Sequence, residues 1–486
     1  MLERLRDATR GASDEAPPPL AVLVTLLVLL GSLRLFFPGD VPFINDEPAL
    51  VQAALEANES GTPASAGLLG TRGVRNGPAA IWFYQLSLAL THDLRNVALA
   101  KIAIVTSLTC VALVLIARAG LPVVPGLGAF ALLSPYLWLY ARDLWDNSFA
   151  IPLSAMLLAA YIRFCRDERL RWLGVAALFG TLCFLTHFMT LPLVGAVGLH
   201  FAATRWRSVA ESPRFAAAVA GILVLCLVLA LPYLVQLSGR SLTSFRWLPS
   251  PRPLAFSLNG LRLFTLAGFD YFIGPWSLGG SGPIVRLATL FSYVAGAVGL
   301  AVIVTDVRRG DRLRRQVASV LLLALALFVL VANGRGLTEH PHYYNGMWIV
   351  FFCIWWIGMS RLVREAWARR AFAVQVVVML AFLVGLPTWI HQSQGTRSLR
   401  YGPTLTNQMA VAEELERLGV DGVPIGPGLR ARLFPHAIGV LRELSRAEGA
   451  VGSPAVADSV EIVYADPEGR GGEIAVRRRP PPDPRS

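Results

Sequence analysis

Long apolar stretches alternate along the chain with short polar linkers. About eleven of these stretches approach the roughly 20 residues that a helix needs to cross a bilayer, where an open backbone finds no hydrogen-bond partners. They lie near residues 20–37, 97–117, 121–140, 149–164, 172–187, 189–203, 215–235, 284–304, 317–332, 346–363 and 371–390. The pattern predicts an all-α polytopic membrane protein with about 11 transmembrane helices.

One further apolar stretch, from Ala79 to Thr91, is too short to cross a bilayer. Trp82 and Tyr84 lie near one end of it, and aromatic rings favour the depth of the lipid headgroups. We expect an amphipathic helix that lies in the membrane interface on the outer side.

Arginine-rich linkers set the expected orientation, because cytoplasmic loops carry an excess of Lys and Arg. These linkers are residues 163–171, 205–214, 308–315 and 361–370. Placing them inside, together with a cytoplasmic segment 1–19, predicts a multi-pass protein of the cytoplasmic membrane with its C-terminus outside. The first apolar run lacks a small-residue cleavage site, so it is expected to be an uncleaved span. The outer face then receives residues 38–96, 142–148, 236–283, 333–345 and everything after Ile390.

Three further segments complete the expected domain organisation. A transmembrane domain occupies residues 20–390, with its first outer loop at 38–96. Residues 391–476 have the pattern of a small extracytoplasmic α/β domain, with helices at 404–418 and 429–444 and a strand at 460–464. The Arg- and Pro-rich end, 477–486, is expected to be disordered.

Composition supports the membrane assignment. Of the 486 residues 54% are hydrophobic and 16% charged, with a mean hydropathy of +0.53, against about 25% charged residues in soluble domains. The net charge of +12 comes from short arginine clusters between apolar stretches, which argues against nucleic-acid binding. The five cysteines form no CxxC pair and are interpreted as small membrane-core residues.

The first outer loop carries two adjacent carboxylates, Asp46 and Glu47, directly before Pro48 and a predicted helix that ends near Ser60. One interpretation is structural: Asn45, Asp46 or Glu47 caps the helix and Pro48 occupies its first turn. The other is catalytic, with a carboxylate as general base. The two are compatible, because a cap also fixes a carboxylate in place.

A second polar cluster lies between two predicted spans, at residues 333–345. Arg335, His340, His342 and Tyr343 suit a phosphate or headgroup site. The alternatives are an interfacial aromatic belt, an arginine at a helix end or on lipid phosphate, and solvated histidines. Glu339, His340 and His342 do not have the HExxH spacing of a metal site.

The remaining candidates are also expected on the outer side. Asp143 and Asp146, after Arg142, either line a pocket or cap a helix and pair with that arginine. Arg72 and Arg75 lie in a glycine-rich stretch without P-loop spacing and are candidates for donor or lipid phosphate. His187 either reaches the same cavity as a pocket residue or only satisfies the backbone of a hairpin.

These features occur in an order that resembles protein O-mannosyltransferases and related bacterial lipid-linked sugar transferases, which include the lipid A aminoarabinose transferases (glycosyltransferase family 39-like, GT-C fold). Their Asp-Glu motif is similar to Asp46-Glu47, although Gly77 replaces a proline of a later motif. The similar segments are 46–53, 76–84, 134–136, 142–147, 180–187 and 340–344.

The resemblance implies an inverting transfer of a hexose or pentose from a polyprenyl-phosphate-linked donor. Asp46 would be the general base, Glu47 would support that base or position the acceptor, and Trp82 and Tyr84 would be part of the pocket. The partners would be the donor, membrane lipids and an acceptor (a protein, a lipid or a cell-envelope glycan). No cofactor is predicted, but a divalent cation held by these acids, as in some GT-C enzymes, stays an open alternative.

Two other functions compete with this one. A transporter or flippase of lipid-linked saccharides would bury charges at mid-membrane and show matched halves; here charges such as Lys101 lie near span ends. An O-antigen-type ligase or polymerase would depend on arginine and histidine in a large outer loop.

Overall fold

The structure is a computed structural model of the chain. It describes residues 20–70, 74–237, 259–266, 283–334, 341–398, 401–420, 423, 429, 434–447, 460–466 and 471–478. Arg72, Arg335 and His340 therefore lie outside the described residues.

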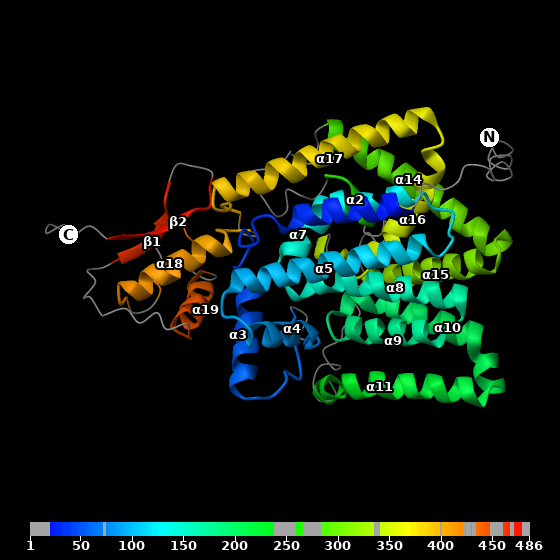
Figure 1. Cartoon of the computed structure of the whole chain (residues 1–486), viewed down its shortest axis with the longest axis horizontal. Helices are drawn as coiled ribbons and strands as arrows, with labels where there is room; N and C mark the ends of the chain where they lie inside the picture. Colours follow the sequence, from blue (N-terminus) through cyan, green and yellow to red (C-terminus); the bar gives the residue numbers. More distant parts are fainter. Residues whose placement is uncertain are drawn as a thin grey trace.

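A bundle of long helices that run side by side forms most of the molecule (Figure 1). Within the described residues, six helical segments are long and apolar enough to cross a membrane. They are α5 (Leu94–Ala117), Asp146–Asp167 with α8 (Ala150–Asp167), α11 (Pro213–Leu237), α14 (Pro283–Arg309), α15 (Arg312–Gly334) and α17 (Ala366–Gln392). The expected all-α polytopic fold is confirmed.

Shorter helices fill the remaining predicted spans. They are α2 (Leu20–Ser32) with η1 (Leu33–Leu35), α9 (Leu170–Phe184), α10 (Leu191–Glu211) and α16 (Trp348–Leu362). The stretch at 79–91 forms only α4 (Ala79–Leu88), whose 10 residues are too short to cross a bilayer.

One predicted span differs from the expectation. Residues 121–140 are not one helix but α6 (Pro125–Gly128), η2 (Ala129–Leu133) and α7 (Pro135–Arg142). Ser134 ends the first part in an extended conformation and its hydroxyl accepts the N–H of Leu137, while Pro135 occupies the first turn of α7. Such a cap followed by proline starts a new helix.

The core lies around α8 and α16. Of the most apolar 18 residues of the α8 span, 94% are buried, against 17% for α11, which leaves α11 free to face lipid. α14 and α16 approach so closely that a Cβ on Gly299 would lie 1.9 Å from the Ile354 carbonyl oxygen. Small residues permit such close packing of membrane helices.

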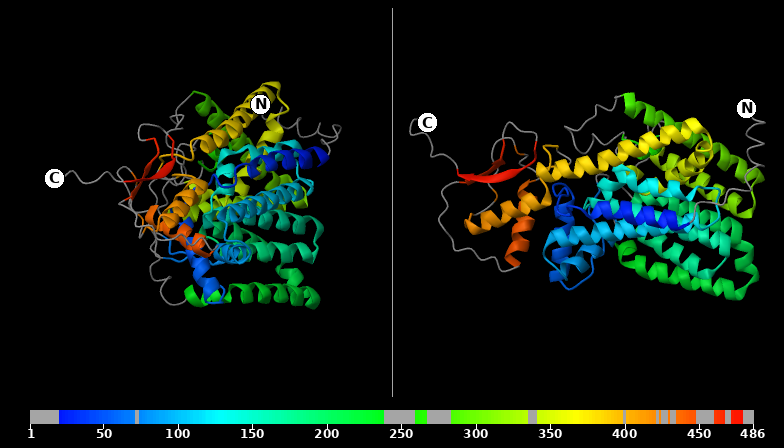
Figure 2. Two further views of the ribbon diagram at one scale, coloured as in Figure 1. Left: turned by 60° about the vertical axis from the view of Figure 1, so that its left-hand side comes forward. Right: turned by 45° about the horizontal axis from the view of Figure 1, so that its top comes forward.

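The C-terminal part is a small α/β unit at one end of the bundle (Figure 2). It contains α18 (Leu405–Arg417), α19 (Phe434–Ala447) and the antiparallel pair β1 (Val460–Tyr464) and β2 (Ile474–Arg478). This unit was expected, but Arg477 and Arg478 belong to β2 rather than to a disordered tail.

The same end of the bundle carries the first outer loop. α3 (Glu47–Glu59) runs across the long helices there and contacts α19, while the α8–α9 linker lies at the opposite end (Figure 1). The loop 38–96 and the C-terminal unit thus share one side, as the expected topology requires. Which side faces the cytoplasm stays a prediction.

Candidate active site

Four carboxylates meet where two separate parts of the chain come together. Asp46 and Glu47 lie at the start of α3, and Asp143 and Asp146 lie in the corner between α7 and α8, which η3 (Asp146–Phe149) continues. The two pairs influence each other's ionisation, since the charge of Asp46 raises the pKa of Asp143. Lys101 reaches the same region from α5.

The adjacent acids of α3 have different environments. Asp46 occupies the N-cap position, but its side chain makes no capping hydrogen bond and is exposed. Glu47 is only 2% exposed, and its carboxyl Oε2 accepts the N–H groups of Asn45 at 2.7 Å and Ile44 at 3.3 Å. Glu47 therefore fixes the loop, and Asp46 is the carboxylate that a substrate can reach.

Trp145 connects Asp46 to the second polar cluster. Although the Asp46 side chain is open to solvent, the protein atoms around its carboxyl group partly desolvate it and raise its pKa, while a hydrogen bond from the Trp145 side chain lowers that pKa. The Trp145 ring also lies 4.8 Å from the ring of His342, which packs against Tyr343 at 4.2 Å. The structure therefore brings the early acid and the late histidine–tyrosine segment into contact with the same indole.

Glu47 and Asp143 form a buried pair. Burial, and then the neighbouring charge of Asp143, raise the pKa of Glu47 well above its ordinary value. Burial also raises the pKa of Asp143, while Lys101 and a hydrogen bond from Glu47 lower it. Glu47 is thus the protonated member of the pair, and its carboxyl O–H donates a hydrogen bond to the Asp143 carboxylate.

Lys101 is fully buried beneath this pair. Its ammonium donates to the carbonyl oxygens of Tyr140 at 3.0 Å, Ala141 at 3.2 Å and Asp143, and lies 5.4 Å from the centre of the Phe149 ring. A cation at the carbonyl end of α7 satisfies the acceptors that a helix terminus leaves open. It holds the corner that carries Asp143, Trp145 and Asp146.

Asp146 faces the first outer loop. Its carboxylate, 2% exposed, accepts the side-chain amide of Asn76 at 2.8 Å and the N–H of Asn147 at 2.6 Å. The hydroxyl of Tyr84 donates to the carbonyl of Leu144 in the same corner. The loop and the corner are therefore fixed to each other.

A sequence model of the dolichyl-phosphate-mannose-protein mannosyltransferase family matches residues 75–235, about a third of the chain. The resemblance to this superfamily is confirmed. Among solved structures, ArnT from Cupriavidus metallidurans bound to undecaprenyl phosphate is similar, with 14% identity and a TM-score of 0.48 over 93% of this chain and 97% of that one. No curated protein sequence matches the chain.

The region matched by the mannosyltransferase family contains Asn76, Lys101, Asp143 and Trp145, but not Asp46 or His342. The family match therefore covers the corner of the cluster, and the geometry alone connects the corner to the acid of α3. That geometry consists of the contacts through Trp145 and Asp143.

The other predicted pocket residues lie around the loop. Trp82 donates from its indole to the Ala64 carbonyl at 2.7 Å, and Arg75 donates to the Gly67 carbonyl at 3.3 Å. His187 accepts the N–H of Met189 at 3.2 Å, and burial lowers its pKa to about 4, so the ring is neutral. These contacts are with backbone groups, and that of His187 matches its structural alternative.

Several residues of the cluster were not selected from the sequence. Trp145 lies between two selected acids, and Lys101 is the only lysine of the chain, placed in an apolar span. A buried ionisable residue in a span is by itself a functional signal. Asn345 and Tyr136 gave no comparable signal; the amide of Asn345 donates to the Asn147 carbonyl at 3.1 Å and its oxygen accepts from Tyr136.

Among the described residues, no group of three or more His, Cys, Asp or Glu side chains is arranged to hold a metal ion.

Proposed function

We propose that the protein is a membrane glycosyltransferase that moves a sugar from a polyprenyl-phosphate-linked donor to a hydroxyl or amine of an acceptor at the outer face of the membrane. The observation that carries the proposal is the exposed carboxylate of Asp46 beside Trp145, whose ring packs on His342. The family match, named for mannosyl transfer from dolichyl phosphate, supports the reaction class and the type of donor.

In the proposed reaction Asp46 takes the proton of the acceptor hydroxyl or amine. The acceptor heteroatom forms a bond to the anomeric carbon, and the bond from that carbon to the phosphate oxygen breaks. Its electron pair stays on the phosphate, so polyprenyl phosphate leaves and the configuration at the anomeric carbon inverts. The transition state resembles an oxocarbenium ion, as in other glycosyl transfers.

The roles of the other residues follow from the resemblance and, for those that the structure describes, from their positions. His342, whose ring packs on Trp145, is proposed to contact the donor phosphate, together with Arg335, His340 and Tyr343 of the same segment. Arg72 and Arg75 of the outer loop are the further candidates for phosphate. Glu47 supports the loop before Asp46 and keeps it in place.

The test is transfer by purified protein from a panel of polyprenyl-phosphate sugars, followed by mass spectrometry of the product. We expect Asp46→Asn to lower kcat by about 10²–10⁴-fold, the contribution of a general base. Asp93→Asn is the matched control, because Asp93 is another acid at a helix N-cap of the same loop, paired with Arg95 at 2.9 Å.

Asparagine also caps helices well, so both variants are expected to fold and insert. An Asp46→Asn enzyme with wild-type turnover on a confirmed donor would exclude Asp46 as the base. An Asp93→Asn enzyme that loses activity to the same degree would assign the loss to the loop as a whole.

A further inference from the structure

The C-terminal unit contacts the loop that leads to Asp46. We call residues 401–406 the strap and residues 39–44 the entry loop. In the strap, the N–H of Leu405 donates to the Val41 carbonyl at 2.9 Å, and the N–H of Thr406 donates to the Gly39 carbonyl at 3.1 Å. The hydroxyl of Tyr401 donates to the Asp40 carbonyl at 2.7 Å. Three successive carbonyls of the entry loop are thus held by the strap.

The contact is too close for ordinary side chains. A Cβ on Gly39 would lie 2.0 Å from Oγ1 of Thr406, and a Cβ on Gly402 would lie 3.0 Å from the side chain of Ile44. Gly402 also has a φ of +69°, which favours glycine. The strap itself is fixed to α18, since Oγ1 of Thr404 accepts the N–H of Asn407 at 3.2 Å.

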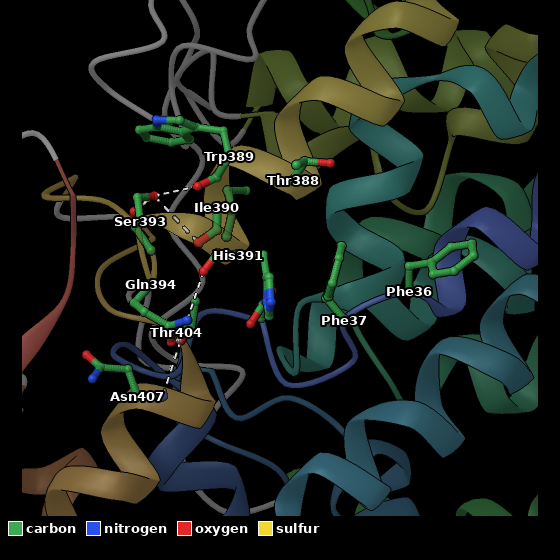
Figure 3. Close-up of polar contacts among 12 residues, drawn as sticks. Phe36, Phe37, Thr388, Trp389, Ile390, His391, Ser393, Gln394, Thr404 and Asn407 are labelled. Carbon is green, nitrogen blue, oxygen red and sulfur yellow. Dashed lines mark hydrogen bonds and ion pairs between the residues drawn. The ribbon is translucent and has the colours of Figure 1, made fainter.

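A second contact connects the end of α17 to the entry loop. Nδ1 of His391 lies 2.9 Å from Oδ2 of Asp40, and its ring stacks on Phe37 at 4.1 Å (Figure 3). From the bundle side, the buried guanidinium of Arg142 donates to the carbonyls of Phe36 at 2.6 Å and Asp40 at 3.2 Å. The entry loop is therefore held between Arg142 and the C-terminal part of the chain.

The entry loop leads directly to the acids. Ile44 ends it, and the N–H groups of Ile44 and Asn45 bind the carboxyl of Glu47, next to Asp46. Any shift of residues 39–44 is thus transmitted through these two amides to the start of α3. We infer that the C-terminal unit is a positioning element, whose strap fixes the entry loop and so sets the place of Asp46 relative to Trp145; this rests on the function proposed above.

The first test needs no enzymatic activity. In Tyr401→Phe, we expect hydrogen exchange to rise about fivefold at the amides of Ile44, Asn45, Leu405 and Thr406, the effect of losing one hydrogen bond. Tyr464→Phe is the matched control, because Tyr464 lies in β1 of the same unit, where its ring lies under Arg397 at 4.6 Å. Equal exchange in the two variants would overturn the inference.

The second test is rescue by a disulfide. A Cβ on Gly39 would lie 3.4 Å from Cβ of Thr406, close to the spacing of about 3.5–4.5 Å in disulfides. We therefore expect Gly39→Cys with Thr406→Cys to form a disulfide on oxidation. The five native cysteines are free and lie in or beside helices of the bundle, away from the strap.

Tyr401→Phe is expected to lower kcat about tenfold with KM almost unchanged, because small displacements of a catalytic group are costly. The disulfide added to Tyr401→Phe should restore kcat to within about twofold of the wild type. A disulfide that forms without restoring kcat would overturn the positioning role, as would two reactive cysteines that fail to pair. If the wild type transfers no sugar from any donor, the proposed function fails, and the exchange and disulfide measurements still decide whether the strap holds the loop.

Discussion

α8 has a group of charged residues at each end, and the two groups differ in how their carboxylates are paired. At the end beyond Asp167, Glu168 forms ion pairs with Arg205 at 3.0 Å and with Arg312, and Asp167 pairs with Arg163 at 2.5 Å. The two pairs of Glu168 connect the α8–α9 turn to α10 and α15. Because the bond from Arg205 favours the charged form, the pKa of Glu168 is lowered.

At the other end of α8, the carboxylates lack such partners. Among the described residues, no arginine or lysine nitrogen lies within ion-pair distance of Asp46, Glu47, Asp143 or Asp146. Desolvation raises the pKa of Asp46, Glu47 and Asp143. One fold therefore uses carboxylates as ion-pair cross-links at one end of α8 and holds carboxylates with raised pKa values at the other, a pattern that functional sites favour.

Of the substitutions that test this comparison, removal of the Lys101 ammonium should have the largest effect. Lys101→Met leaves the buried carbonyls of Tyr140 and Ala141 without their donor, and each such group costs about 1–3 kcal/mol. We expect the free energy of unfolding to fall by about 3 kcal/mol or more, measured as a shift in thermal unfolding in detergent.

Arg95→Met is the control on the same helix, where the exposed pair with Asp93 contributes less than about 1 kcal/mol. Lys101→Gln keeps N–H donors and should recover part of the loss. If Lys101→Met unfolds at the wild-type temperature, the ammonium does not hold the corner, and the contrast between the two ends of α8 loses its structural basis.

Trp145→Phe should change the chemistry more than the stability. The indole N–H lowers the pKa of Asp46, so its removal raises that pKa. A base must be deprotonated to act, so the acid limb of kcat/KM against pH should move upward by about one to two units, given about 1.5–3 kcal/mol for a hydrogen bond to a charge.

Trp82→Phe is the matched control, since its indole donates to a backbone carbonyl and not to an acid. Its acid limb should coincide with that of the wild type. If the acid limb of kcat/KM against pH is unchanged in both variants, Asp46 is not the group whose titration produces that limb.

The sequence predicted the layout of the molecule because hydropathy and arginine placement report which solvent surrounds each segment. The helical bundle, the short helix at 79–88 and the strand at 460–464 were expected on this basis. Hydropathy could not predict the break at Ser134, because residues 121–140 are apolar on both sides of it. A local cap and a proline decide that boundary.

The sequence also singled out the correct type of residue in the site, but not the difference between its members. Asp46 and Glu47 are adjacent and chemically alike. Only the fold determines that Glu47 is buried and that its carboxyl group accepts the N–H groups of Ile44 and Asn45. Trp145 gains its importance from contacts with two segments distant in sequence. Such contacts depend on tertiary packing, which a single sequence does not encode locally.

Of these substitutions, Glu168→Gln should have the smallest effect, and the effect should be limited to the arginine-rich end of α8. Because the pKa of Glu168 is lowered in the folded protein, its ion pairs stabilise the fold above the unfolded pKa of about 4, and this contribution disappears as pH falls through the folded value. The side chain is 45% exposed, so solvent screening limits the loss at pH 7 to less than about 1 kcal/mol. The difference in thermal unfolding from the wild type should therefore be small at pH 7 and absent once the pH lies well below the folded pKa of Glu168, while kcat and its acid limb stay unchanged. A shifted acid limb in Glu168→Gln would show that the two ends of α8 are coupled and that their carboxylates do not have separate roles.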